Sequence, residues 1–262
     1  MTEPLPTIAR AGVRVLLVLA LAGCGDDSSD GTTATTSTTQ PAVIDLGDSG
    51  DYHPEMDPAD FVERIDNPYL PFLPGTRWVY EGDSDGAHER IEVEVTTDRR
   101  EVMGITAVVV RDTVYVDGAM AEDTYDWFAQ DRDGNVWYLG EDTHEYEDGK
   151  VVSSEGAWEA GVDGARPGIV MPARPEVGDA YRQEYLAGEA EDMGEILQVA
   201  VARTIGLGDY DDVAVTRDWT PLEPEVVEEK WYAAGIGLIR EAATDGGTGS
   251  SELVQFTRPP AG

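Results

Sequence analysis

The chain has 262 residues, of which 53 are acidic and 18 are lysine or arginine, so its formal net charge is −35 at neutral pH. A surface this acidic repels nucleic acid and anionic lipid headgroups, and it concentrates cations and cationic partners. The charge therefore excludes a nucleic-acid-binding protein. It fits either a solvated surface suited to a salty or divalent-rich exterior or a specific cation function, and the composition leaves both open.

The N-terminus has the layout of an export signal. Arg10 and Arg14 precede an apolar run over residues 15–21, which is too short to span a bilayer. The run ends in Leu-Ala-Gly-Cys at positions 21–24, which resembles the lipobox of bacterial lipoproteins. The resemblance implies a signal peptide over residues 1–23 and attachment of lipid, such as palmitate, to Cys24. The alternative is an ordinary secretory signal that happens to contain a cysteine.

If Cys24 carries lipid, the protein is held on the extracytoplasmic face of the cell membrane by that anchor alone. Residues 24–56 are rich in Asp, Ser, Thr and Gly, so they cannot bury enough surface to fold and are predicted to form a disordered, acidic tether. Residues 57–262 are long enough for a single domain. Because Cys24 is the only cysteine, that domain has no thiol for a disulfide, a thiolate metal site or a nucleophile.

The domain is predicted to be mainly β, with antiparallel meander sheets after one short N-terminal helix. The helix is expected to begin at Asp57, an N-cap residue followed by proline, and to place Phe61, Val62 and Ile65 on one face. Asp-Gly pairs favour the positive φ angles of tight hairpins. Four such pairs mark turns at 85–86, 117–118, 133–134 and 148–149, and their spacing predicts an antiparallel meander.

The domain also contains two similar halves, at about residues 74–150 and 177–258. An internal duplication predicts two sheets that pack as a sandwich or curl into a half-barrel around one core. The alternative is that antiparallel strands resemble one another because they share a composition. Segments 74–76, 89–95, 110–113, 127–130 and 134–138 match, in the same order, segments 177–179, 195–201, 216–219, 231–234 and 235–239.

Aromatic residues at matched places in the two halves are candidate ligand-binding residues. They are placed either to line a cavity between the sheets or to pack in the core, as tryptophan commonly does in two-layer β folds. A Gly/Pro-rich segment between the halves, residues 158–172, either lines such a site or plugs the end of the core. The candidates are Trp127, Trp137, Tyr138, Trp158, Trp231 and Tyr232.

One segment has the spacing of a calcium loop. Asp131, Asp133 and Asn135 occupy its positions 1, 3 and 5, and Glu141 lies near the place of a closing bidentate carboxylate. Gly134 stands at the fourth position rather than the sixth, so a plain hairpin turn is the competing interpretation. No other cofactor is predicted, and no catalytic residues stand out by their spacing.

Several segments resemble a family of uncharacterised secreted bacterial proteins and lipoproteins. They are Asn67-Pro68-Tyr69, residues 74–82, the run from 110 to 138 and residues 232–239. The resemblance covers most of residues 60–245 and implies no activity. A looser likeness, in fold only, is to envelope lipoproteins whose curved antiparallel sheet shelters an apolar ligand.

Two functions follow from these patterns. The favoured one is a membrane-anchored binding module, without enzymatic activity, for a small apolar ligand, a glycan or an envelope protein partner. It predicts a cavity lined by some of Trp127, Trp137, Trp158 and Trp231. The second is a carboxylate-based hydrolase or a calcium-dependent enzyme, and it predicts inward-facing acids with raised pKa values in one cleft.

Overall fold

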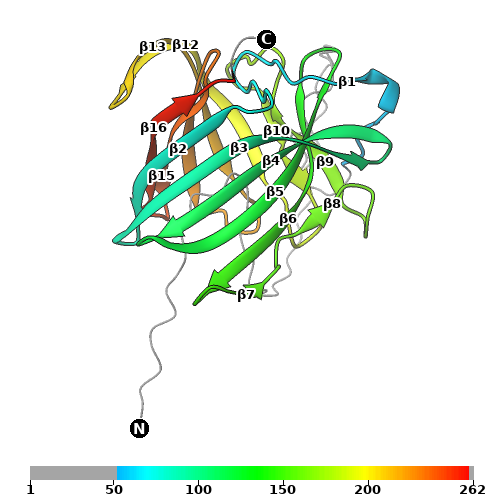
Figure 1. The fold of residues 1–262 in the computed structure, drawn as a ribbon. Helices are drawn as coiled ribbons and strands as arrows, with labels where there is room; N and C mark the ends of the chain where they lie inside the picture. The colour runs from blue at the N-terminus through cyan, green and yellow to red at the C-terminus, as the bar shows by residue number, and fades with distance from the viewer. Residues whose placement is uncertain (1–51, 260–262) are drawn as a thin grey trace, which may run out of the picture.

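The computed structural model describes residues 52–259, which form an antiparallel sheet curled into a nearly closed, barrel-like shape (Figure 1). The predicted mainly β, antiparallel fold class is confirmed, in its curved rather than its sandwich form. The elements are η1 (Pro58–Asp60), β1 (Phe61–Val62), β2 (Arg77–Ser84), β3 (Ala87–Val102), β4 (Ile105–Val116), β5 (Ala119–Asp131), β6 (Val136–Glu147), β7 (Lys150–Ser153), β8 (Trp158–Glu159), β9 (Arg166–Met171), β10 (Ala180–Arg182), β11 (Glu184–Tyr185), β12 (Met193–Ile205), β13 (Gly208–Trp219), β14 (Val227–Ala233), β15 (Gly237–Asp245) and β16 (Ser250–Thr257).

The sheet runs in the order β10-β12-β13-β14-β15-β16-β2-β3-β4-β5-β6-β9-β11. Its two ends are formed by strands that follow each other directly in the chain. β10 pairs with β12, with Ala180 opposite Glu195, and β11 pairs with β9, with Tyr185 opposite Arg166. The segment 180–185 therefore bridges both ends of the sheet and brings its two halves around one interior.

Three of the four predicted Asp-Gly turns have the backbone expected of them. The pairs at 85–86, 117–118 and 148–149 combine an aspartate φ near 50° with a glycine φ between 72° and 82°. At 133–134 only Gly134 has a positive φ, and the turn is held instead by Asp131, whose Oδ1 accepts from the Gly134 and Asn135 amides. Met103 and Gly104 form a further tight turn, between β3 and β4, that no Asp-Gly pair announced.

The predicted N-terminal helix is wrong. Asp57 does accept a hydrogen bond from the Ala59 amide at 2.9 Å, as an N-cap residue does, but it caps only the single 3-10 turn η1. Phe61 then enters β1, pairs with Asp131 of β5 and packs edge-on against Trp137 at 6.5 Å. The strand partner and the aromatic contact outweigh the local helical signal.

The same pairing register recurs in the two halves of the sheet, here called the first half (β2 to β6) and the second half (β10 and β12 to β15). Asp126 of β5 lies opposite Glu141 of β6, and Lys230 of β14 lies opposite Glu241 of β15. A register shift follows within two residues in both halves. The backbone therefore presents side chains at corresponding positions, although the duplication itself stays a prediction.

The register also corrects the sequence match between β3 and β12. Val95 exchanges backbone hydrogen bonds with Gly75 and Thr76, and Ile196 does the same with residues 178 and 179. Val95 therefore corresponds to Ile196, whereas the match of 89–95 with 195–201 aligned it with Val201. β12 carries three register shifts against β13, and sequence similarity alone does not reveal such bulges.

The predicted signal peptide, Cys24 and most of the predicted tether lie outside the described residues. Within residues 52–259, no helix is long and apolar enough to cross a membrane. The interior is filled by alternate residues of the long strands, including Ile91, Val95, Val110 and Phe128. This alternation is what directs a few charged side chains inward together with the apolar ones.

Candidate functional site

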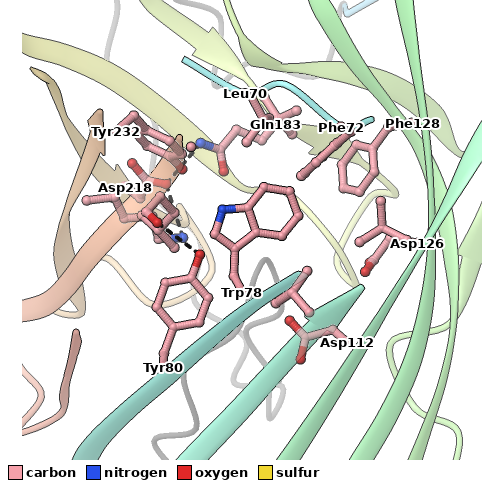
Figure 2. A pocket seen from close by; sticks show the side chains of 16 residues that line it. Leu70, Phe72, Trp78, Tyr80, Asp112, Asp126, Phe128, Gln183, Asp218 and Tyr232 are labelled. Carbon is pink, nitrogen blue, oxygen red and sulfur yellow. Dashed lines mark hydrogen bonds and ion pairs between the residues drawn. The ribbon is translucent and has the colours of Figure 1, made fainter. Parts of the chain in front are cut away.

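A cavity lies in the interior between the two halves of the sheet (Figure 2). The cavity has a volume of about 50 Å³ and is only partly enclosed. Its wall is mostly aliphatic and aromatic, with five polar or charged side chains. The lining residues are Leu70, Phe72, Trp78, Tyr80, Val93, Val110, Asp112, Asp126, Phe128, Val170, Gln183, Asp218, Lys230, Tyr232, Gly237 and Leu238.

Trp78 stands in the middle of this site. Its indole Nε1 donates to the Ile236 carbonyl at 2.8 Å, and its ring meets Phe72 edge-on at 5.9 Å. From the same strand, the Tyr80 hydroxyl donates to the Leu238 carbonyl at 2.9 Å. Both side chains point inward because they are alternate residues of β2, and they tie the first half of the sheet to the second.

On the side of the second half, the cavity is bordered by a buried ion cluster. Lys230 Nζ lies 3.2 Å from Asp218 Oδ2, 3.7 Å from Glu241 Oε2 and 3.9 Å from Glu228 Oε2. Burial acts to lower the pKa of Lys230, but the surrounding carboxylates, Glu241 first, outweigh it, so that pKa lies well above its usual value. The lysine is therefore held in its charged form, and the cluster contains its own counter-charge.

Asp218 is further fixed by two neutral partners. Gln183 Nε2 donates to its Oδ2 at 3.0 Å, and Thr216 Oγ1 donates to its Oδ1 at 2.6 Å. Gln183 belongs to the segment that bridges the two ends of the sheet, so the cluster also links that bridge to β13. These hydrogen bonds fix the orientation of the Asp218 carboxylate on this side of the cavity.

On the side of the first half, the polar side chains are all acids. Asp126 lies opposite Glu141, and the Tyr138 hydroxyl donates to Asp126 Oδ1 at 2.7 Å. Asp112 is 5% exposed, and neither of its carboxyl oxygens has a hydrogen-bond partner among the described residues. A buried and unpaired carboxyl is costly in its charged form.

The pKa values of these acids follow from that environment. Burial raises the pKa of Asp126 to about 7, although the hydrogen bond from Tyr138 acts to lower it. Burial also raises the pKa of Asp112 well above its usual value, and the negative charges of Asp126, Glu122 and other acids add to the shift. Burial and the negative charge of Asp126 also raise the pKa of Glu141. Of these three acids with raised pKa values, Asp112 and Asp126 line the cavity and Glu141 does not, so the hydrolase hypothesis stays a prediction.

Of the six aromatic candidates, the structure brings two to the cavity. Tyr232 lines it, and Tyr138 borders it through its hydrogen bond to Asp126 and by stacking on Phe128 at 4.9 Å. Trp158 lies behind Tyr138, which it meets edge-on at 5.2 Å. The binding role of these residues stays a prediction.

The other three candidates lie elsewhere. Trp127 and Trp231 directly follow Asp126 and Lys230 in their strands, so they point to the opposite face of the sheet. Arg100 lies over the Trp127 ring at 4.0 Å, and Arg203 and Arg240 lie over Trp231. Trp137 donates through Nε1 to Asp131 Oδ2 at 2.8 Å. The expected lining by tryptophans is therefore not what the structure has, since Trp78 is the tryptophan of the cavity.

The four candidate calcium ligands are not assembled into one site. The Asp131 carboxylate accepts four hydrogen bonds from within its own turn, including those from Asn135 and Trp137. Asp133 is exposed, and Glu141 lies opposite Asp126, which is about 16 Å along β5 from Asp131 at the usual rise of a strand. Within residues 52–259, no group of three or more His, Cys, Asp or Glu side chains is arranged to hold a metal ion.

The residues that sequence reasoning missed are Trp78, Asp112, Asp126 and Lys230. Asp112 and Asp218 stood in matched segments of the two halves, but nothing in those segments showed that they face inward. The available signal was strand alternation, because an aspartate two residues from Val110 or Val114 in an apolar strand shares their face. Lys230 was visible as one of only two lysines in the folded domain.

Comparisons with known proteins give little further guidance. No family model matches the sequence, and no curated protein matches it. The resemblance to uncharacterised secreted proteins therefore stays a prediction. Among solved structures, a protein from Parabacteroides distasonis ATCC 8503 described as a "putative lipoprotein" is 12% identical, with a TM-score of 0.34 over 73% of this chain and 99% of that one. At that level the similarity supports no statement about fold or function.

Proposed function

We propose that this protein is a lipid-anchored binding module on the extracytoplasmic face of the cell membrane. Its ligand is a small molecule with an apolar body, which enters the cavity between the two halves of the sheet. The observation that carries the proposal is the cavity itself, a partly enclosed space with aromatic walls and a few convergent polar groups. Small-molecule sites commonly combine these properties.

The anchor in this proposal rests on the sequence. The Leu-Ala-Gly-Cys segment ending at Cys24 is typical of lipid attachment, and the acidic tether and domain are unsuited to direct contact with anionic headgroups. Stable anchoring takes two or more acyl chains, which a lipidated Cys24 supplies. The lipid therefore provides the membrane contact that the charge of the domain disfavours.

A carboxylate-based hydrolase is the second candidate, and a specific observation favours it. Burial raises the pKa of Asp126 to about 7, and Asp126 lies opposite Glu141 on the neighbouring strand. The pair therefore shares features with general acid–base groups. However, Glu141 is not among the residues that line the cavity. Of the acids that do line it, Asp218 is paired with Lys230, and Asp112 and Asp126 lie opposite Val93 and Val110. A calcium-dependent enzyme has less support, because the proposed ligands are spread along β5 and β6.

Binding is tested with the full-length protein and three probes of equal size: 1-butanol, n-butylammonium and butyrate. We expect at least one probe to raise the melting temperature and to bind in calorimetry, because a ligand of the folded state stabilises it. The variant Val93→Phe places a ring in the cavity wall and is expected to abolish that binding. Val151→Phe, the same change at a side chain that is 48% exposed, is the matched control and should bind normally.

Two results would count against the proposal. Absence of binding by all three probes would remove the cavity as a small-molecule site. Turnover of chromogenic esters or glycosides that is lost in Asp126→Asn would favour the hydrolase instead. Mass spectrometry of an organic extract of the natively purified protein then identifies what the cavity holds in the cell.

A further inference from the structure

The two halves of the sheet place opposite charges at one corresponding position. Asp126 lies opposite Val110 of β4 and Glu141 of β6, and Lys230 lies opposite residue 216 of β13 and Glu241 of β15. In each half an aspartate that lines the cavity stands two residues further along the neighbouring strand, at 112 or 218. The first half thus has acids at the positions of Asp218 and Glu241, a threonine at the position of Glu228, and an aspartate where the second half has the lysine.

The ammonium of Lys230 supplies the counter-charge for the acids of the second half. It lies within 4 Å of three carboxylates, and it remains charged although it is buried. In the first half the corresponding acids are Asp112 and Glu141, with Asp126 in the place of the base. Among the described residues that line the cavity, Lys230 is the only base, and its ion pairs are with the acids of the second half.

Asp112 supplies the second and independent observation. Its side chain is 95% buried (5% exposed), it lines the cavity, and both of its oxygens lack a hydrogen-bond partner among the described residues. Figure 2 shows Asp112 and Asp126 together on one side of the Trp78 ring, with Asp218 and Tyr232 on the other. Two carboxyl groups therefore face a cavity with acceptor capacity that the protein does not use.

We propose that the ligand of this cavity is a small organic cation whose ammonium group binds Asp112 and Asp126, in the place that corresponds to the Lys230 ammonium of the second half. This inference rests on the proposed binding function and names the chemistry of its ligand. The apolar body of the ligand lies against Trp78 and Phe128. Aromatic faces attract cations, so the same rings also favour the charged head.

An organic cation fits this site better than a metal ion. Within the described part of the chain no three carboxylate, imidazole or thiolate side chains are arranged to hold a metal. Divalent cations such as calcium take six or more oxygen ligands, whereas the described residues of the first half place only two carboxyl groups, Asp112 and Asp126, on the cavity wall. A primary ammonium needs only a few acceptors and carries its own apolar chain.

The proposed binding is linked to protons. Burial is the main cause that keeps the pKa of Asp112 high, and the negative charges of acids from two neighbouring strands add to it. These acids are Asp126, Glu122 and Asp123 of β5 and Glu89 of β3. A bound ammonium favours the carboxylate forms of Asp112 and Asp126, so their pKa values fall and protons pass to the buffer. Neutral ligands of the same size bring no such change.

The test compares the three butyl probes on the full-length protein at pH 6, below the pKa of Asp126. We expect n-butylammonium to bind at least about tenfold more tightly than 1-butanol, since hydrogen bonds to charged groups are worth about 1.5–3 kcal/mol. We expect butyrate to bind more weakly than either. Calorimetry in buffers of different ionisation enthalpy should show that the ammonium, and not the alcohol, releases protons.

Two variants test whether Asp112 and Asp126 cause the preference for n-butylammonium. Asp112→Asn should lose the tenfold preference and reduce proton release while still binding 1-butanol. Asp126→Lys copies the second half, so its own ammonium should occupy the site, abolish n-butylammonium binding and raise the melting temperature. Asp211→Asn, which removes an exposed acid on β13, is the control and should behave as the wild type.

The outcomes separate this inference from the function on which it rests. Binding of 1-butanol as tightly as n-butylammonium, blocked by Val93→Phe but unaffected by Asp112→Asn, would overturn the cation assignment and leave the binding module standing. Binding of no probe would remove both. If Asp126→Lys does not fold, the Asp112→Asn result decides the question alone.

Discussion

The buried carboxyl groups have different partners in the two halves of the sheet. In the second half, Asp218 and Glu241 share a lysine, and Gln183 and Thr216 complete the hydrogen bonds of the aspartate. In the first half, Asp126 has one tyrosine hydroxyl and Asp112 has no hydrogen-bond partner among the described residues. Asp126 and Lys230 have corresponding strand partners in the two halves, so the difference at these positions lies in the side chains.

Because of this difference, the second half is expected to have a structural site and the first half a receptive site, that is, one that binds a ligand. In the second half, burial raises the pKa of Glu241 well above its usual value, but the Lys230 ammonium acts to lower it and supplies a counter-charge. Among the described residues of the first half, no cation lines the cavity beside the acids, and Asp112 retains unused acceptors. Stability and binding capacity are therefore expected to lie on opposite sides of the same cavity. Each of the following variants tests one side of that comparison.

The largest effect is expected for Lys230→Met. Removing one partner of a buried ion cluster leaves the other charges uncompensated, which costs about 3–5 kcal/mol. Lys230 is 5% exposed and is the cation of the cluster around Asp218, so we expect a loss of that order in the free energy of unfolding, measured with urea at pH 7. The loss should shrink at acidic pH, where the carboxyls bind protons.

The chain offers a matched control for this change. Lys150 is exposed at the start of β7, and Lys150→Met is expected to change the free energy of unfolding by less than about 0.5 kcal/mol. Equal effects of the two lysine variants would mean that the cluster contributes nothing to stability, and the proposed division between the halves would fail.

A smaller effect, of a few kcal/mol at most, is expected for Asp126→Asn, and it depends on pH. The folded pKa of Asp126, about 7, is above the ordinary aspartate value near 4. The folded state therefore holds the proton more tightly, and the stability that this gives below pH 4 is lost as the pH rises through 7. Asparagine keeps the acceptor for Tyr138 and removes this part of the pH dependence.

The measurement is urea unfolding of wild type and variant at several pH values between 4 and 8. We expect the variant to gain on the wild type as the pH rises, while Asp112 and Glu141, whose pKa values are also raised, leave a residual slope of the same sign. Parallel curves would show that Asp126 ionises in the folded state as it does in water. Asp211→Asn should give the wild-type curve.

The sequence predicted the fold class, because its signals were local. Asp-Gly turns and alternating strands specify an antiparallel meander residue by residue, as the turns at 85–86 and 117–118 show. The helix after Asp57 was predicted from the same kind of signal and failed, because β5 competes for Phe61. Local preference does not report on a partner that lies about 70 residues away in the chain.

The candidate site was harder to predict because it depends on which face of each strand turns inward. Trp127 and Asp126 are neighbours in the chain, yet the aspartate lines the cavity and the tryptophan lies beneath Arg100 on the other face. Trp127 was predicted to line the cavity because it is large and apolar, but its side chain lies on the opposite face of the strand. A buried aspartate contradicts the usual preference of its residue type, so only the assembled sheet reveals Asp112 and Asp126.

The smallest effect is expected on the outer face, where the halves again correspond. Trp231 lies beneath Arg203 and Arg240, and Trp127 lies beneath Arg100, which also pairs with Glu159. Arg203→Ala should lower the free energy of unfolding by about 0.5–1 kcal/mol, the usual contribution of an exposed cation–π contact. Arg100→Ala should cost somewhat more, because it also removes the ion pair.

These two arginine variants test whether the contrast between the halves is confined to the cavity. Both tryptophans are covered by arginine, so similar small losses in urea unfolding would show that the outer faces are equivalent and that only the inward positions have diverged. A loss for Arg203→Ala as large as that for Lys230→Met would place a comparable share of stability on the outer face. The division between a structural and a receptive side would then no longer follow from the charges at positions 126 and 230 alone.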